Sequence, residues 1–563
     1  MSNRVFHQLS LCFVAFMLTA CLAIPIPVTL LDGAESDASD TPKVLADVTV
    51  SILPLAPKSE CEERFVEHTL PFATGIRIRE INTYESNGAG VAINDLDNDG
   101  DLDLLFASID NESEILWNEG SLSFRAESLP IRFTRGVQIV DVDGDLALDV
   151  VFTLRGVAPP SYWRNLGDGE LVQDILPGVK SLAYSMAWAD LNGDSALDLV
   201  TGSYNIDLIP RGIDFPAEDE RAGVIVYTQN KGQFDALRLT GESEALSIAV
   251  LDLNDDGHQD LWIANDFDLT DGFWLNQSDG WLATLPFDEI SHSTMSIDWG
   301  DLSNDGSTAL FTTDMMPYDD APETVAAWQP VMEAMMTQHV PIEGDPQLME
   351  NVLQVREDEW QNQAAQRGIV ATGWSWAGRL GDLDNDGLLD LYVVNGMIAQ
   401  NMFGHLPNGE LVEENQVFRN RGDGTFEPMP RWGLGSTASG RGMVMADLDS
   451  DGDLDIVINN LRASAQLFEN RLCGGKGLLV DLLWPDSGNS RAIGAEIVLE
   501  TSIGRLTRDV RASGGYLSGD PARVHFGLPK DAEIRQLNVL WPDGAKSSVE
   551  QVSQQMLYTL TRE

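Results

Sequence analysis

The sequence predicts an all-β protein, a seven-bladed β-propeller followed by a small β-sandwich domain. An acidic nine-residue pattern recurs seven times between residues 95 and 455, and successive copies start 46 to 81 residues apart. Each copy follows a short apolar stretch, and most lead directly into an apolar stretch that is typical of a buried strand. Regular repeats of this length with several short strands are typical of propeller blades.

Each repeat also supplies the second half of a blade. Behind most loops comes an aromatic residue, then an asparagine, then a glycine turn, as in EILWNEG and QVFRNRGDG. This pattern predicts a third strand that is joined to a fourth strand by a tight hairpin. The fourth strand usually opens with a bulky residue such as Phe124, Phe234 or Phe426. A stacked solenoid is the structural alternative, and a unit of four strands disfavours it.

The two ends of the repeat region complement each other. Residues 65–69 (FVEHT) read as a fourth strand but precede the first loop, whereas the seventh repeat ends at QLFENRLC without a fourth strand. We therefore expect the N-terminal strand to complete the last blade and close the ring. Cys61 and Cys473 would then lie on neighbouring strands, and we expect a disulfide between them, as in exported proteins.

Two repeats carry inserts. Residues near 317–350 interrupt the fifth repeat with a Met-rich stretch at helical spacing, PETVAAWQPVMEAMMTQH. We expect a helix that packs on the rim or face of the propeller, and a lid over a ligand site is the alternative. Residues 204–222 form a second, acidic insert in the third repeat. With these inserts the propeller is expected over residues 61–473, and the sandwich domain over residues 474–563.

The N-terminal residues 1–21 read as an export signal. An apolar run too short to span a bilayer is followed by LTAC, which resembles a bacterial lipobox ending at Cys21. We expect lipidation at Cys21 and a bacterial cell-envelope lipoprotein at the outer membrane or cell surface; an ordinary signal peptide is the alternative. Residues 22–60 have the composition of a flexible linker, in which ADVTVSIL permits one short strand.

The formal net charge of −54 limits the partners of this protein. It excludes nucleic acid and disfavours adhesion to a bare anionic membrane, so the expected membrane contact is through the lipid anchor only. Apolar residues make up 43% of the chain, which supports a large buried core.

The acidic repeats are candidate calcium loops. Aspartates at alternate positions can turn their oxygens toward one centre if the chain bends sharply, and a glycine at the sixth place permits that bend. Clustered hard oxygen ligands suit Ca²⁺ better than Mg²⁺, which demands a tight octahedral shell. Three loops carry four acids and the glycine: Asp95, Asp97, Asp99 and Asp103; Asp382, Asp384, Asp386 and Asp390; and Asp447, Asp449, Asp451 and Asp455.

The remaining loops depart from this pattern. The fourth loop keeps the glycine and has one amide oxygen among its ligands: Asp252, Asn254, Asp256 and Asp260. Two loops carry their glycine two places early, and their candidate ligands are Asp141, Asp143, Asp145 and Asp149 in one and Asp190, Asn192, Asp194 and Asp198 in the other. We expect these last two loops to bind metal with an altered turn. The fifth loop, with Asp301, Ser303 and Asp305, has Ala309 at the closing place and is expected to be empty.

Two family resemblances extend over roughly residues 62–560. The seven loops with their strands resemble FG-GAP (VCBS-type) repeats, which also occur in integrin α-subunit heads. The tail resembles the ASPIC/UnbV domain through NSRAIGA (489–495), GGYLS (514–518), HFGL (525–528) and WPDG (541–544). Ser490 and Pro529 depart from the usual family pattern. The resemblance implies secreted or surface-bound proteins with calcium loops and with adhesion or ligand-binding roles.

The function expected from the sequence is a calcium-binding, surface-anchored adhesion or ligand-binding protein with a non-catalytic propeller and Ca²⁺ as its cofactor. Its ligand would be a protein or glycan that the sequence does not identify. A carbohydrate-active enzyme, a polysaccharide lyase or hydrolase, is the alternative, because propellers of this type occur in such enzymes. His292 and His525 stand in no recognisable catalytic spacing and are expected to pack locally.

Overall fold

The computed structural model describes residues 47–58, 60–206, 219–267, 269–338 and 344–563. The predicted signal peptide, Cys21 and most of the predicted linker lie outside the described residues. Among the described residues, no helix is long and apolar enough to cross a membrane.

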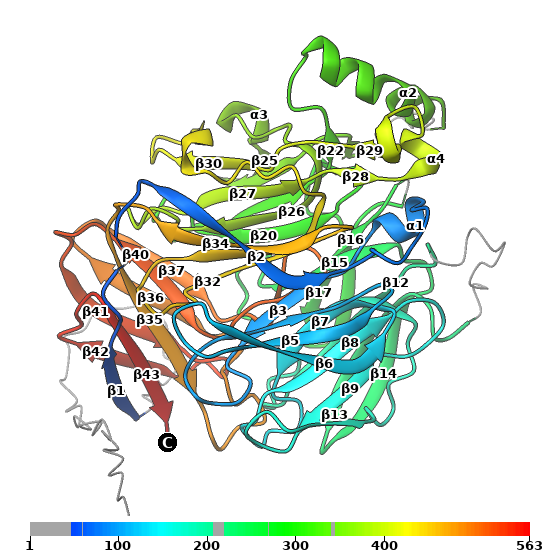
Figure 1. Ribbon diagram of the computed structural model, residues 1–563. Coiled ribbons are helices and arrows are strands. Elements are labelled where there is room, and N and C mark those ends of the chain that lie inside the picture. Colours follow the sequence, from blue (N-terminus) through cyan, green and yellow to red (C-terminus); the bar gives the residue numbers. More distant parts are fainter. Residues whose placement is uncertain (1–46, 59, 207–218, 268, 339–343) are drawn as a thin grey trace, which may run out of the picture.

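The described chain is mostly β, with many four-stranded sheets that are consistent with a propeller (Figure 1). Within the described residues, seven antiparallel four-stranded units, here called repeat sheets 1 to 7, follow one another along the chain. Repeat sheets 1 to 4 are β3 (Val91–Asn94), β4 (Asp103–Phe106), β5 (Glu112–Asn118) and β6 (Phe124–Arg132); β7 (Thr134–Val140), β8 (Asp149–Leu154), β9 (Ser161–Asn165) and β10 (Leu171–Asp174); β11 (Ala183–Ala189), β12 (Asp198–Ser203), β13 (Val224–Asn230) and β14 (Gln233–Thr240); and β15 (Ala245–Leu251), β16 (Asp260–Asn265), β17 (Gly272–Gln277) and β18 (Gly280–Thr284).

The last three units complete a ring. Repeat sheets 5 to 7 are β20 (Ser296–Gly300), β21 (Ala309–Thr313), β24 (Val352–Arg356) and β25 (Trp360–Asn362); β26 (Gly373–Gly381), β27 (Asp390–Asn395), β30 (Gln416–Asn420) and β31 (Phe426–Pro428); and β32 (Gly440–Ala446), β33 (Asp455–Asn460), β34 (Ser464–Arg471) and β2 (Arg64–Ala73). The first strand of each sheet contacts the first strand of the next, and β32 returns to β3. The buried apolar residues lie mainly between these sheets.

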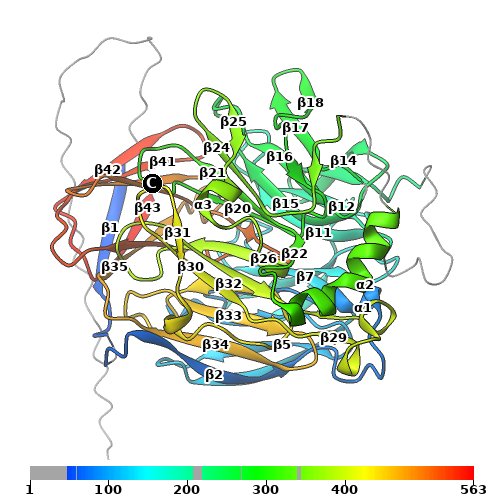
Figure 2. The ribbon, with the colours of Figure 1, turned by 90° about the horizontal axis from the view of Figure 1, so that it is seen from above.

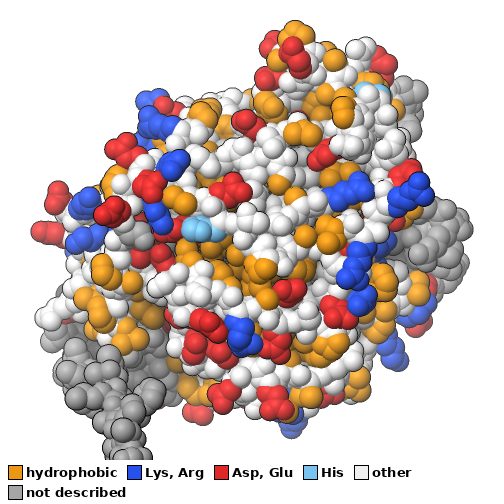
Figure 3. Space-filling view, in the orientation of Figure 1, with side chains coloured by type: hydrophobic (Ala, Val, Ile, Leu, Met, Phe, Trp, Pro, Cys, Tyr) orange, Lys and Arg blue, Asp and Glu red, His pale blue; other side chains and the backbone are white. Residues whose placement is uncertain are grey.

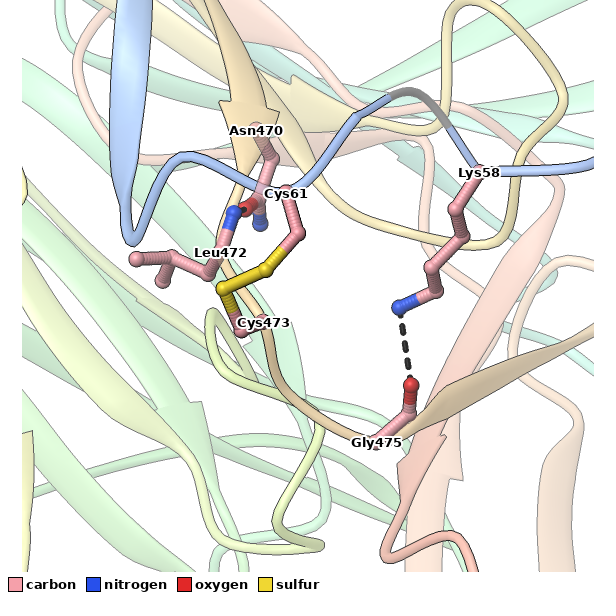
Figure 4. Close-up of a disulfide and its surroundings, with 6 residues drawn as sticks. All are labelled: Lys58, Cys61, Asn470, Leu472, Cys473 and Gly475. Carbon is pink, nitrogen blue, oxygen red and sulfur yellow. Dashed lines mark hydrogen bonds between the residues drawn. A yellow bond between two sulfur atoms is a disulfide. The ribbon is translucent and has the colours of Figure 1, made fainter.

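The N-terminal strand closes the seventh sheet, as the sequence predicts. β2 pairs antiparallel with β34, from Arg64 opposite Arg471 to Ala73 opposite Ser464. Cys61 and Cys473 lie just outside this pair and form a disulfide with their Cα atoms 5.1 Å apart. Figure 4 shows this disulfide beside Lys58, whose Nζ donates to the carbonyl oxygen of Gly475 at 2.8 Å.

The C-terminal domain is formed by two four-stranded sheets around one apolar core. One sheet has the order β1 (Val48–Pro54), β43 (Met556–Arg562), β35 (Lys476–Leu483) and β40 (Val524–Leu528); the other has β37 (Arg505–Asp509), β36 (Glu496–Thr501), β41 (Ile534–Leu540) and β42 (Lys546–Glu550). β1 comes from the segment predicted as a flexible linker. It is the short strand that ADVTVSIL permits. Val50 is buried in this core and the strand pairs with β43 along its length, so residues 48–54 are part of this domain and not of a flexible linker.

A short hairpin of the C-terminal domain enters the ring of repeat sheets. Its strands β38 (Ser513–Gly514) and β39 (Ser518–Gly519) contact the first strands of six repeat sheets, and Tyr516 packs against Trp376 of the remaining sheet. Tyr516 is fully buried. Gly90 allows this approach, since a Cβ there would lie 1.8 Å from the carbonyl oxygen of Leu517. The hairpin therefore fills the centre of the ring, which sequence analysis did not predict.

Three of the helices, α1 (Thr83–Ser86), α2 (Pro322–Gln338) and α4 (Gln400–Phe403), lie together on one side of the repeat sheets (Figures 1 and 2), and α4 contacts the other two. α2 falls within the predicted insert, and its Trp328 and Val331 are buried against the repeat sheets. The other short elements are α3 (Ala364–Arg367), η2 (Pro407–Gly409), η3 (Pro430–Trp432), β19 (Ile290–Ser291), β22 (Met315–Met316), β23 (Gln347–Leu348), β28 (Met397–Ile398) and β29 (Glu410–Leu411).

Candidate metal loops

Each acidic loop joins the first and second strands of a repeat sheet, and its first aspartate holds the turn. In the sixth loop, Oδ1 of Asp382 accepts from the backbone N–H of Asp386 at 3.0 Å, and Oδ2 accepts from that of Gly387 at 2.8 Å. Asp447 makes the equivalent bonds in the seventh loop. Bonds between a carboxylate and backbone N–H groups are strong, so this aspartate shapes the loop before any metal binds.

The fourth and sixth places of the loop adopt left-handed backbone conformations. Asn385 has φ 55° and Gly387 has φ 94°. In the second loop Gly144 has φ 76° and Leu146 has φ 78°, and in the third loop Gly193 and Ser195 have φ 74° and 67°. In these two loops the glycine takes the fourth place, and a residue with a side chain bears the strain at the sixth. The turn is altered to the extent that the N–H of Gly144 or Gly193 also donates to the first aspartate at 2.8 Å.

The closing aspartate connects the loop to the third strand. Oδ2 of Asp390 accepts from the backbone N–H of Leu383 at 3.0 Å, and Oδ1 accepts from that of Asn420 at 2.8 Å. The equivalent pairs of bonds occur in five further loops, at Asp103, Asp149, Asp198, Asp260 and Asp455. Ala309 takes this place in the fifth loop and offers no such acceptor.

Four loops gather three carboxylates closely enough for a shared cation. Within the described residues, ligand oxygens lie within 4.8 Å of one another in four groups: Asp95, Asp97 and Asp99; Asp141, Asp143 and Asp149; Asp382, Asp384 and Asp390; and Asp447, Asp449 and Asp455. Buried Oδ1 atoms of Asp95 and Asp384 accept no hydrogen bond. Orphaned buried carboxylate oxygens at the centre of an all-oxygen cluster fit a hard cation such as Ca²⁺.

The electrostatics of these loops favour a bound cation. Burial, followed by repulsion from neighbouring aspartates, raises the pKa of Asp382 and of Asp447 well above the usual range. Burial raises the pKa of Asp95 to about 6 and that of Asp103 to about 7. A cation supplies the opposite charge that keeps such buried carboxylates ionised.

The third and fourth loops close differently. The side-chain amide of Asn192 donates to Oδ2 of Asp194 at 3.1 Å, and that of Asn254 donates to Oδ2 of Asp256 at 3.0 Å. Among the described residues, neither loop brings three carboxylates within 4.8 Å of one another. An amide N–H in each of these loops thus satisfies one carboxylate oxygen of its neighbouring aspartate.

Two arginines that sequence analysis missed pair with loop aspartates. Nε of Arg419 lies 2.6 Å from Asp384, and its Nη2 lies 2.7 Å from Asp386. Arg164 pairs in the same way with Asp143 and Asp145. Both arginines precede the hairpin asparagine, in the sequences FRN and WRN, so the signal was present in the repeat pattern. Each guanidinium neutralises part of the negative charge of its loop.

The recurring hairpin asparagine joins neighbouring repeat sheets. The side-chain amide of Asn470 donates to the carbonyl of Leu383, the second residue of the preceding loop, at 2.8 Å. Six sheets make this bond at 2.7 to 2.8 Å: Asn118 to Leu448, Asn165 to Leu96, Gln229 to Val142, Asn276 to Leu191, Asn420 to Leu302, and Asn470 to Leu383. In the fifth sheet Arg356 pairs with Asp255 instead.

The C-terminal domain lies on the acidic loops. Its Gly475 N–H donates to the carbonyl of Asp384 at 3.2 Å, and the ring of His525 contacts the carbonyl of Gly452 at 3.1 Å. On the other side, the Ser490 hydroxyl donates to Oδ2 of Asp141 at 2.5 Å, and Arg523 donates to the carbonyl of Gly100 at 3.2 Å. The departure from the family pattern at Ser490 therefore falls on a contact with a loop.

Buried ion pairs hold the two domains together beside these loops. Nη2 of Arg379 lies 2.6 Å from Asp520, and Nη1 of Arg511 lies 2.7 Å from Asp298. The Arg511 guanidinium also stacks on Trp299 at 4.4 Å from the ring centroid. A cavity of about 140 Å³ lies between the domains here, lined by these arginines and by the first aspartates of loops 5, 6 and 7.

The comparisons with known proteins agree with this organisation. Residues 95–152, 141–201 and 407–458 match the family described as FG-GAP-like repeat, and residues 485–563 match the family described as ASPIC and UnbV. The chain contains FG-GAP-like repeats and a C-terminal ASPIC/UnbV domain. Both resemblances predicted from the loop and tail motifs are confirmed to this extent.

Similar curated proteins carry the name cartilage acidic protein 1. The protein from Xenopus tropicalis is 24% identical over 510 residues, which is 82% of this chain and 72% of that protein. The protein from Mus musculus is 29% identical over 31% of this chain and 26% of its own length. The protein from Homo sapiens is 29% identical over 29% of this chain and 24% of its own length.

Among solved structures, two crystal structures of BBS1N in complex with ARL6DN, one soaked with mercury and one with lead, each have 10% sequence identity to this chain. Their TM-scores are 0.38 and 0.39, and each match covers 72% of this chain and 97% of that chain.

Proposed function

We propose that the protein is a calcium-stabilised adhesion or ligand-binding protein of the cell exterior, with a seven-bladed propeller as its scaffold. The four groups of three carboxylates carry this proposal, because all-oxygen clusters of this kind suit Ca²⁺. The ring of seven first strands supports the blade count. Calcium has a structural role here: it binds the folded loops and so stabilises them.

The location outside the cytosol has two supports. The Cys61–Cys473 disulfide is of a kind that persists in oxidising compartments. The LTAC sequence at Cys21 supports a lipid anchor on the bacterial envelope. We expect Cys21→Ala to release the protein from the membrane fraction, and mass spectrometry of the wild-type N-terminal peptide to find the lipid; an unmodified peptide in wild type would refute the anchor.

The ligand is proposed to be a protein or a glycan that contacts the protein away from the loops. The loops hold the sheets and dock the C-terminal domain, so little of loops 6 and 7 is left for a partner. Binding to glycan and surface-protein arrays, measured with and without Ca²⁺, separates ligand binding from calcium binding.

Equilibrium dialysis against radioactive Ca²⁺ tests the calcium proposal. We expect at least four ions per chain, in line with the four carboxylate groups, with dissociation constants on the order of 10⁻⁴ to 10⁻³ M. Fewer than one ion per chain at 10 mM Ca²⁺ would refute it.

A further inference from the structure

Three exposed apolar side chains lie on chain segments that hydrogen bonds connect. Ile76, Phe133 and Val157 are 54%, 55% and 57% exposed. The backbone N–H groups of Gly75 and Arg77 bind the two carboxylate oxygens of Asp110, beside Ile109.

Arg155 ties the other two apolar residues to this segment. Its side chain donates to the carbonyl of Ile109 at 3.2 Å, and its backbone N–H donates to that of Phe133 at 2.8 Å. Val157 follows two residues later. These three side chains, with Arg77 and Arg79, are called the Phe133 surface.

Phe133 is held in a strained conformation. Its φ is 61°, in the left-handed region that bulky residues avoid. An aromatic side chain that is more than half exposed gains little from burial that could offset this cost. Strain of this kind concentrates at binding and active sites, where the surrounding chain holds a side chain in a required position.

Among the described residues, Arg77 and Arg79 carry unpaired positive charge beside these apolar residues, although Glu80 and Glu410 line a hollow with Arg79. Within the described residues, the Arg77 and Arg79 guanidinium groups pair with no carboxylate, although the chain has 89 acidic residues against 35 basic ones. Arg79 lines this polar hollow of about 610 Å³ together with Arg462, which donates to the carbonyls of Ile78 and Arg79. Figure 3 shows Lys and Arg side chains along the right-hand side of the view, near the position of α1 in Figure 1.

We propose that the Phe133 surface docks a segment of a partner protein that carries an apolar anchor flanked by aspartate or glutamate. Apolar side chains at the centre of a polar, arginine-bearing rim are the usual arrangement of a protein interface. An anionic polysaccharide fits less well, because it needs no apolar contact and because a chain of net charge −54 repels a long polyanion. This inference deepens the proposed ligand-binding function and rests on it.

The test begins with a phage library of random 12-residue peptides selected on the immobilised full-length protein in Ca²⁺ and 150 mM salt. We expect the selected peptides to combine large apolar residues with Asp or Glu. Synthetic peptides from the selection should bind the double variant Arg77→Glu/Arg79→Glu at least tenfold more weakly. Lys530→Glu/Arg535→Glu, on exposed residues of the C-terminal domain, is the matched control and should bind like wild type.

Phe133→Gly separates binding from folding. Glycine accepts a φ of 61° without strain, so the melting temperature should stay unchanged or rise while peptide binding falls at least tenfold. Lys231→Gly is the control, since Lys231 is also exposed and has φ 52° in a distant hairpin; it should keep full binding.

Every other outcome contradicts the proposal. One such outcome is a selection that yields no peptides or only basic ones, and another is equal peptide binding by all variants. The proposal is also contradicted if peptides do not bind but heparin does, and the arginine variants abolish heparin binding. Self-association of the protein that is lost in Phe133→Gly would contradict it as well. The Phe133 surface contains no loop aspartate. Melting that is indifferent to chelator would therefore refute the calcium proposal without deciding this one.

Discussion

The sixth and fourth acidic loops share five of nine residues, including the first and closing aspartates, and have opposite surroundings. Asp382 to Asp390 lies against the C-terminal domain, and Asp382, Asn385 and Asp390 are buried. Asp252 to Asp260 touches no residue of that domain through a hydrogen bond among the described residues, and its central residues 255–258 are exposed. In the buried loop the carboxylates gather within 4.8 Å, whereas in the exposed loop an asparagine amide bonds to Asp256.

The two loops differ both in burial and in the acid at the third place, Asp384 against Asn254, and both differences bear on how strongly a loop favours a cation. In water, repulsion between carboxylates is weak, and solvent satisfies their oxygens. Under the C-terminal domain the same charges lose their hydration, and burial raises the pKa of Asp382 and Asp390 well above the usual range. We therefore expect calcium to contribute most to stability in the covered loops.

Removal of the first aspartate should separate the two loops most clearly. Asp382→Ala leaves the half-buried N–H of Asp386 and the buried N–H of Gly387 without an acceptor and removes a proposed metal ligand, so we expect a loss of about 4 kcal/mol in Ca²⁺. Asp252→Ala breaks equivalent bonds where water replaces them and should cost about 1 kcal/mol. Calorimetric melts of both variants in 10 mM Ca²⁺ measure the difference, and equal losses would contradict the account.

Loss of a hydrogen bond between repeat sheets should also cost more stability at the covered sixth loop than at the exposed third loop, although both losses should be smaller than that of Asp382→Ala. Asn470 is buried and donates to Leu383 in the covered sixth loop and also to Leu454, so Asn470→Ala should cost about 2 kcal/mol. Asn276 is half-buried and donates to Leu191 in the third loop, so Asn276→Ala should cost about 1 kcal/mol. Urea unfolding of the two variants beside wild type checks this, and a larger loss for Asn276→Ala would reverse the order that burial predicts.

A single substitution should make the exposed loop resemble the covered one. Asn254→Asp replaces the amide that bonds to Asp256 by a carboxylate and restores the four-acid pattern. The shift in melting temperature between chelator and Ca²⁺ should then grow, by an amount equivalent to about 1 kcal/mol. Gln277→Asp, at an exposed position in the same sheet outside the loop, is the control. If the calcium response of Asn254→Asp is no larger than that of wild type, the number of carboxylate ligands does not limit calcium binding by this loop.

The smallest effect is expected from relief of backbone strain. Leu146→Gly and Ser195→Gly put glycine where φ is 78° and 67°, and each should stabilise the protein by about 0.5–1 kcal/mol. Glycine at the sixth place of the other loops already has this conformation, for example Gly387. Melting temperatures measured in Ca²⁺ check the pair, and destabilisation of both would mean that the side chains contribute more than the strain costs.

The sequence predicted much of this arrangement because the same acidic repeat occurs seven times. Alternating aspartates, apolar strands and the missing fourth strand at residue 473 led to the sheets, the N-terminal closure and the Cys61–Cys473 pair. The hairpin asparagine was visible as a pattern, but its partner is the carbonyl of another repeat, which no spacing reveals. Arg419 was missed because its aspartates lie 33 and 35 residues away.

Other features depend on contacts between distant segments. Val48–Pro54 has linker-like neighbours, and only its pairing with β43 at the far end of the chain makes it a strand. The hairpin around Tyr516 reads as a glycine-rich turn, yet it is buried because the ring leaves room for it. The same limit applies to the loops: coverage of Asp382 by the C-terminal domain sets its electrostatics, and that contact is absent from the local pattern.

The most direct test of the central claim is the calorimetric melt of the full chain in EDTA and in 10 mM Ca²⁺ at constant ionic strength. With a dissociation constant near 10⁻⁴ M, each occupied loop should add about 2.7 kcal/mol, so the melting temperature should rise markedly with Ca²⁺. The rise should shrink in Asp384→Asn, in the covered sixth loop, and persist in Asp256→Asn, in the exposed fourth loop. A melting temperature that is the same in EDTA and in Ca²⁺ would contradict the account.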